Sequence, residues 1–153
     1  MTEDQILDYE QAANSFAWGE ETLLSMINLY DEEHFNKEAL RLHKGIMKKD
    51  FEEIRIGGYI MKGPASYIGA RRPYNISAEI QRKGAAKESM SLILKDYREF
   101  LNIARELKKE MAKILKRPIS VDFADFDIFE TQVRIAFPDE FKENTPAQHM
   151  NPV

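Results

Sequence analysis

The chain of 153 residues contains no cysteine, and this absence excludes two kinds of site. Without thiols there is neither a disulfide framework nor a zinc or iron–sulfur centre held by cysteine. A chain of this length buries about 70% of the surface of its unfolded form, so a single domain needs no such cross-link. The lack of cysteine fits a reducing compartment, and we expect a cytoplasmic location, with the nucleus as a second compartment.

Long apolar runs and a basic N-terminal start are also missing. No uncharged run approaches the 18 or so residues that a membrane-spanning helix requires. A secretion signal begins with basic residues, whereas this chain begins with Glu3, Asp4, Asp8 and Glu10. With 43% apolar and 31% charged residues, the composition is that of a soluble globular protein. We therefore expect no membrane partner.

The net charge of −4 conceals a partition along the chain. Residues 1–38 carry a net charge of −9, residues 39–117 carry +10 and residues 118–153 carry −5. Because Lys and Arg mostly line exposed helix faces, the basic middle is first of all a solvated surface, although it would also attract an acidic partner. Its aromatic residues do not alternate with the basic ones as a stacking platform requires, so we expect no nucleic-acid partner.

Apolar residues in the first 117 positions recur at spacings of three and four, which is typical of amphipathic helices. We expect helices at 4–13, 20–49, 51–68, 73–84 and 86–117, with Asp50 as the N-cap of the third. The fold class is therefore all-α: an antiparallel four-helix bundle with a short N-terminal helix. We divide the chain into this bundle, 1–117, and an acidic aromatic C-terminal extension, 118–153.

The extension has a different pattern. Large apolar residues alternate with polar or small ones at 119–124 and at 132–137, which predicts two short strands within an otherwise irregular segment. The acidic stretch between them has two interpretations: Phe123, Phe126 and Phe129 cover apolar surface of the bundle, or residues 122–130 fold onto the basic middle and modulate access of a partner. Residues 144–153 show no periodicity and are expected to be disordered.

The helix expected at 51–68 breaks the rules of helix propensity. Gly57, Gly58 and Gly63 each cost about 1 kcal/mol relative to alanine, while Pro64 removes a backbone donor and predicts a kink. The apolar spacing nevertheless continues through all of them. We infer that something approaches the backbone closely here.

The stretch from Gly58 to Ala70 resembles the core of the histidine-containing phosphotransfer (HPt) family. The signature of that family is H-x-x-K-G, followed six residues later by glycine, and Lys62, Gly63 and Gly69 match it in place. The run 78–84 resembles the next helix of the family, and the resemblance extends over about 4–117. It implies that the partners are receiver domains of response regulators or hybrid histidine kinases.

One departure decides the function that the resemblance implies, because Tyr59 occupies the place of the phosphorylated histidine. A phenol with a pKa of about 10 is a poor nucleophile without a base, and a phosphotyrosine ester is too stable to pass its phosphoryl group to an aspartate. The resemblance therefore implies a pseudo-HPt protein, which is no enzyme but binds receivers and modulates or inhibits a His–Asp phosphorelay. Pro64 is a second departure, since the family prefers alanine or a small hydroxyl residue there.

The same resemblance implies a receiver-binding set of Arg55, Tyr59, Lys62, Gly63, Ser66 and Gln81. Lys62 matches a lysine that offers a cation to phosphoryl oxygens, Gly63 a glycine that lets the receiver come close, and Gln81 a glutamine near the phosphorylated ring. Each of these side chains also has an ordinary interpretation as solvated surface. We expect no cofactor and no metal site.

Two other functions stay open. The chain could be a helical adaptor or scaffold that has lost receiver binding and acts through its extension. It could instead be an active phosphotransfer protein that uses another histidine. His43 precedes a lysine and a glycine at the wrong spacing, His34 lies among acids, and His149 is near the C-terminus; the three lack the spacing of metal ligands.

Overall fold

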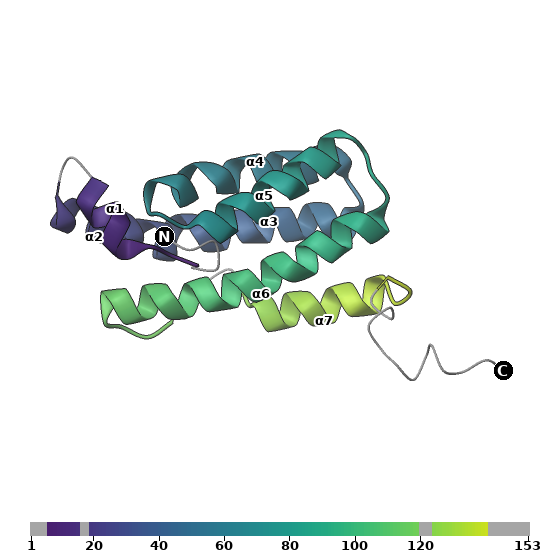
Figure 1. Cartoon of the computed structure of the whole chain (residues 1–153). Helices are drawn as coiled ribbons and strands as arrows, with labels where there is room; N and C mark the ends of the chain where they lie inside the picture. The colour runs from purple at the N-terminus through teal and green to yellow at the C-terminus, as the bar shows by residue number, and fades with distance from the viewer. Residues whose placement is uncertain (1–5, 16–18, 120–123, 141–153) are drawn as a thin grey trace, which may run out of the picture.

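A computed structural model of the chain describes residues 6–15, 19–119 and 124–140, and its regular structure there is entirely helical (Figure 1). The helices are α1 (Tyr9–Ser15), α2 (Glu20–Leu29), the π-helix η1 (Tyr30–His34), α3 (Phe35–Lys48), α4 (Phe51–Tyr67), α5 (Arg71–Ala85), α6 (Met90–Leu115) and α7 (Phe126–Ala136). The all-α class is confirmed, and the four long segments expected from periodicity match the observed helices to within a few residues.

Local sequence accounts for several helix ends. The Asp50 side chain accepts a hydrogen bond from the Glu53 N–H at 3.1 Å, which confirms the predicted N-cap of α4. Ser89 caps α6 in the same way through the Leu92 N–H, and Asp125 caps α7. Gly84, which we expected to end its helix, lies within the last turn of α5. A Cβ there would lie 2.8 Å from the Arg55 nitrogen, so this glycine allows α5 to approach α4.

A single π turn joins α2 to α3 without a break. The Phe35 N–H donates to the Tyr30 carbonyl, five residues back instead of four. The buried stripe of Leu23, Ile27 and Tyr30 therefore resumes at Phe35 after a step of five residues. From there it continues along α3 at the ordinary helical spacing, so both halves of the segment face the same core.

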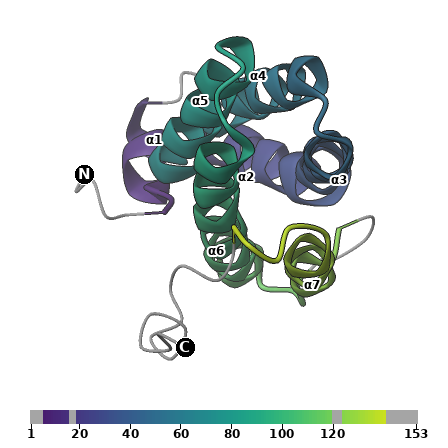
Figure 2. The same cartoon turned by 90° about the vertical axis from the view of Figure 1, so that its right-hand side faces the viewer.

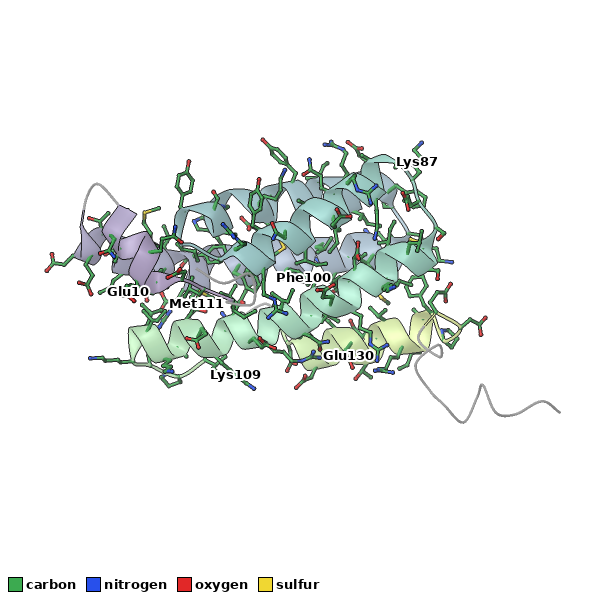
Figure 3. All side chains as sticks on the ribbon, in the orientation of Figure 1. Glu10, Lys87, Phe100, Lys109, Met111 and Glu130 are labelled. Atoms are coloured by element: carbon green, nitrogen blue, oxygen red, sulfur yellow. The ribbon has the colours of Figure 1, made fainter. Side chains whose placement is uncertain are left out.

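The helices pack in an arrangement compatible with a bundle. Helix α4 packs against α3 and α5, and α6 packs against α5, α2 and α7. Figure 2 shows α4 and α5 at one side of the molecule and α7 at the other. Phe100 and Met111 of α6, labelled in Figure 3, are both buried. The Phe100 ring lies 6.2 Å from that of Phe35 and 5.8 Å from that of Tyr97, centre to centre.

A buried ion pair ties the π turn to α6. Asp31 and Lys108 are 1% and 2% exposed, and the ammonium donates to both the carboxylate and the backbone carbonyl of Asp31. Arg117 donates to the second carboxylate oxygen of Asp31 at 2.6 Å and also pairs with Glu32. The buried cation is thus compensated by a carboxylate that contributes to a larger network.

The strand predicted at 132–137 is wrong, because these residues form the second half of α7 and the residue after it. Val133, Ile135 and Phe137 alternate with Gln132, Arg134 and Ala136, but Ile135 is 75% exposed. The buried residues of this segment are Phe126, Phe129, Val133 and Phe137, at helical spacings of three and four. The other strand was predicted at 119–124, and residues 120–123 of it lie outside the described residues. The segment 144–153, predicted to be disordered, also lies outside them.

Helix α7 is held to the other helices by aromatic packing and by one arginine. The Phe126 ring lies 5.9 Å from that of Phe35, and Phe129 is buried as well, as the covering interpretation expects; Phe123 lies outside the described residues. Arg105 of α6 donates to Asp127 at 2.8 Å and to Glu130 at 3.0 Å. The acidic segment therefore does meet the basic middle, on the side of the molecule away from α4 and α5 (Figure 2).

Two of the three glycines in α4 are explained by helix packing. A Cβ at Gly58 would lie 2.7 Å from the Gln81 nitrogen and 2.7 Å from the Ser77 carbonyl oxygen of α5. A Cβ at Gly57 would lie 3.1 Å from Leu42 of α3. The close approach inferred from the sequence is therefore, at these two positions, an approach between helices of the same chain.

Candidate functional site

The predicted receiver-binding residues come from α4 and α5. Tyr59, Lys62, Gly63 and Ser66 follow one another at helical spacing, and Tyr59 is 59% exposed. Gly63 and Ser66 are exposed, whereas Lys62, Arg55 and Gln81 are half-buried. The backbone of Gln81 lies directly against Gly58, the residue before Tyr59. We call the surface formed by these six residues the α4 face.

Lys62 is the centre of an aromatic cluster on this face. Its ammonium nitrogen lies 5.7 Å from the centre of the Tyr59 ring and 5.9 Å from that of the Tyr74 ring. Cation–π contacts at exposed sites contribute about 0.5–1 kcal/mol each. None of the carboxylates in the described ranges forms an ion pair with Lys62. The cation is therefore positioned by the two rings while its charge stays available.

Gly63 leaves the helix backbone bare beside this cluster. A Cβ placed there would meet no atom of neighbouring elements within 4 Å, in contrast to Gly57 and Gly58. A Cβ on the residue before a proline disfavours helical backbone, so Gly63 also allows α4 to continue through Pro64. The Ser66 hydroxyl donates to the Gly63 carbonyl at 2.7 Å. The result is an ordered stretch of helix with exposed backbone.

The sequence prediction missed two tyrosines near this face. Tyr67 is 63% exposed and Tyr74 is 37% exposed. Tyr59, Gly63 and Tyr67 are spaced four residues apart, so extending the predicted exposed stripe by one turn would have found Tyr67. Tyr74 lies on α5, and no spacing within α4 could indicate it. Both tyrosines line a groove of about 470 Å³ between α1, the end of α4 and the start of α5.

Arg55 contributes less free charge than the resemblance implies. Its guanidinium donates to Glu52 through two hydrogen bonds of 3.0 Å and 2.6 Å. Hydrogen bonding to Glu52 raises the pKa of Arg55 and lowers the pKa of the glutamate. A partner would therefore meet an ion pair at this edge of the α4 face, not an isolated cation.

His43 is held inside the protein by both ring nitrogens. It is 4% exposed, with Nδ1 2.6 Å from the Tyr97 hydroxyl and Nε2 2.7 Å from the side-chain oxygen of Gln132. Its ring stacks on Phe129 of α7 at 4.0 Å. Because Gln132 offers an acceptor, Nε2 carries the proton and Nδ1 accepts from Tyr97. Burial lowers the pKa of His43, which favours this neutral form.

The other two histidines differ in accessibility. His34 is exposed at the end of the π turn, after three successive acids, Asp31, Glu32 and Glu33. His149 lies outside the described residues. In the ranges that the structure describes, no group of three or more His, Asp or Glu side chains is placed to hold a metal ion. Within the same ranges, none of the helices combines the length and the apolar character needed to cross a membrane.

Comparison of the chain with protein-family models, with curated proteins and with solved structures finds no match.

Proposed function

We propose that this chain is a pseudo-HPt protein that binds response-regulator receiver domains without carrying phosphate. In this proposal its long helices form an antiparallel four-helix bundle of the HPt type, and in the cytoplasm it competes with true phosphotransfer proteins for receivers. The observation that carries the proposal is the Lys62 cation held between two exposed tyrosine rings next to the bare backbone at Gly63. No contact within the described part of the molecule accounts for this combination.

The chemistry of the α4 face suits a transient acidic partner. Tyrosine supplies contact area and a polar tip at a small cost in side-chain entropy, which is why it is frequent at interfaces. Lys62 would meet the acidic pocket of a receiver, and Gly63 would let the receiver backbone come close to α4. A contact of this kind has a Kd in the micromolar range, about −8 kcal/mol.

The same face lacks the means to transfer a phosphoryl group. Attack by the Tyr59 phenol would need a base to remove its proton. Among the described residues no side chain hydrogen-bonds to the Tyr59 hydroxyl. His43 could take the place of Tyr59 only if α7 moved away, since both of its ring nitrogens are occupied. Receiver binding without transfer is therefore the activity that this geometry supports best.

The direct test mixes the purified chain with a panel of radiolabelled phospho-receiver domains and follows label and complex together. Complex formation without transfer of label supports the proposal. Label on the chain would contradict it and, if acid-labile and alkali-stable, would direct attention to His34 and His43. The absence of both label and complex across the panel would contradict receiver binding.

A charge reversal with a matched control locates the interface. Lys62→Glu should weaken receiver binding at least tenfold, because a carboxylate would replace the cation that faces the acidic pocket. Lys95→Glu makes the same change at an exposed position of α6 and should alter the affinity less than twofold. Equal effects of the two variants would place the interface elsewhere.

One observation favours the alternative of a helical adaptor that acts through the extension. Ile128 and Ile135 of α7 are 53% and 75% exposed and stand two helical turns apart, so they form an apolar stripe on its outer side. A partner that is retained by Lys62→Glu but lost when both isoleucines are changed to serine would support the adaptor function over receiver binding.

A further inference from the structure

The groove beside the α4 face has the lining of a small-molecule site. Its volume of about 470 Å³ lies within the range of roughly 300–1,000 Å³ that is usual for ligand pockets. The buried part of its lining consists of small side chains, among them Ala12, Ala65 and Ala70. The exposed part is aromatic, with Tyr67 and Tyr74. We call this hollow the tyrosine groove.

Backbone contacts hold the walls of the tyrosine groove in place. The Asp8 N–H donates to the Gly69 carbonyl at 3.1 Å and so ties the start of α1 to the turn between α4 and α5. Gly69 has a φ of 79°, and a Cβ there would lie 2.8 Å from the Asp8 carbonyl oxygen. The Ala70 N–H donates to the Ala65 carbonyl at 2.9 Å. The groove is thus formed by ordered backbone before any ligand arrives.

The charges around the groove favour an anion. Among the described residues that line it there is one cation, Arg71, and neither Asp nor Glu. Arg71 is exposed, and within the described ranges it makes no ion pair. The amide side chains of Asn75 and Gln11 add neutral hydrogen-bonding groups. A guanidinium binds carboxylate or phosphate through two parallel hydrogen bonds, whereas tyrosine rings stack on planar rings.

We propose that the tyrosine groove binds a small ligand made of an aromatic ring that carries one carboxylate or phosphate group. The ring would lie against Tyr67 and Tyr74, and the anionic group would bind Arg71. This inference does not depend on receiver binding, because it concerns residues that line the groove and is tested without any receiver.

The test titrates the full chain, labelled with ¹⁵N, with four probes and follows the backbone amide resonances. The probes are 2-naphthoate and 2-naphthyl phosphate, which carry ring and anion, 2-naphthylmethanol, which carries the ring alone, and acetate. Both anionic naphthyl probes should shift resonances of the groove lining, such as those of Gly69 and Asn75. They should bind about tenfold more tightly than the alcohol, and acetate should produce no shifts there. Whichever anionic probe binds more tightly identifies the preferred anionic group.

Two variants separate charge recognition from ring stacking. Arg71→Gln should weaken binding of the anionic probes about tenfold and leave 2-naphthylmethanol unchanged, whereas Lys95→Gln, on α6, should change neither. Tyr74→Ala should weaken all three naphthyl probes. Shifts scattered over the surface, equal binding of the alcohol and the anions, or unchanged binding to Arg71→Gln would each overturn the proposal.

Discussion

Gly58 and Gly63 lie five residues apart in α4, and replacement by alanine should stabilise the protein at Gly63 but not at Gly58. Alanine gains about 1 kcal/mol over glycine in a helix interior. At Gly58 the added Cβ would lie 2.7 Å from two backbone atoms of α5, so α5 would have to move. Overpacking of this kind costs about 1–3 kcal/mol, which cancels or exceeds the gain. At Gly63 no neighbouring element opposes the Cβ.

Pro64 determines how the Gly63 substitution should be made. A Cβ on residue 63 would clash with the ring of Pro64 in helical backbone, so Gly63→Ala by itself should show only part of the gain. In a chain that already carries Pro64→Ala, the whole gain of about 1 kcal/mol should appear. Gly58→Ala in the same background should instead lower the stability or leave it unchanged.

Urea unfolding followed by far-UV circular dichroism measures both effects, with equal m-values as the check that the unfolding reaction is unchanged. For a chain of this size, 1 kcal/mol corresponds to a Tm change of about 2–4 °C. A loss of stability at residue 63 as large as that at residue 58 would refute the reasoning. Gly63 would then serve internal packing, and the bare backbone would no longer support a docking surface.

Three further predictions concern buried polar groups and are measured by the same unfolding assay. Asp31→Ala should cost about 3–5 kcal/mol, because it removes the carboxylate that pairs with the buried Lys108 and with Arg117. The exposed Glu33→Ala should cost under about 0.5 kcal/mol, and similar losses in the two variants would contradict the importance of the buried pair. Burial lowers the pKa of His43 in the folded state, so the stability of the protein should fall as the pH drops below about 6.5. His43→Gln should remove this part of the pH dependence, and a variant with the same pH profile as the parent would contradict the prediction. Burial raises the pKa of Glu38 from 4.5 to about 7, so stability should fall as the pH rises through this range, and Glu38→Gln should stabilise the protein at pH 8 but not at pH 4. A variant equally stable to the parent at both pH values would contradict the last prediction.

The helices could be predicted because their apolar spacing is long and regular. Over 20 or more residues, a period of three to four cannot be mistaken for a period of two. The segment 132–137 is too short for this distinction, and Val133, Ile135 and Phe137 alternate although they belong to a helix and its end. The spacing of Phe126, Phe129 and Val133 would have corrected the prediction, had the whole stretch been considered as one element.

Contacts between distant residues could not be predicted in the same way. Asp31 and Lys108 are 77 residues apart, and nothing in the charge pattern pairs them. The glycines of α4 show the same limit, since they look alike in the sequence. Gly58 faces another helix and Gly63 faces open space, and only the packing of α4 against α5 separates the two cases.

The π turn at Tyr30–His34 accommodates one extra residue while the helices on either side of it keep the same face toward the core. Each residue of an α-helix turns the chain by 100°, and the π turn accommodates one residue more than α-helical geometry allows. Deletion of a single residue there, such as Glu33, would convert the segment into a continuous α-helix of nearly the same length. The step from Tyr30 to the next buried position would then be four residues, which is one ordinary α-helical turn, so Leu23 and Ile27 would stay directed toward the core. Homologues of this protein should therefore tolerate loss of this one residue with only a local change in the turn.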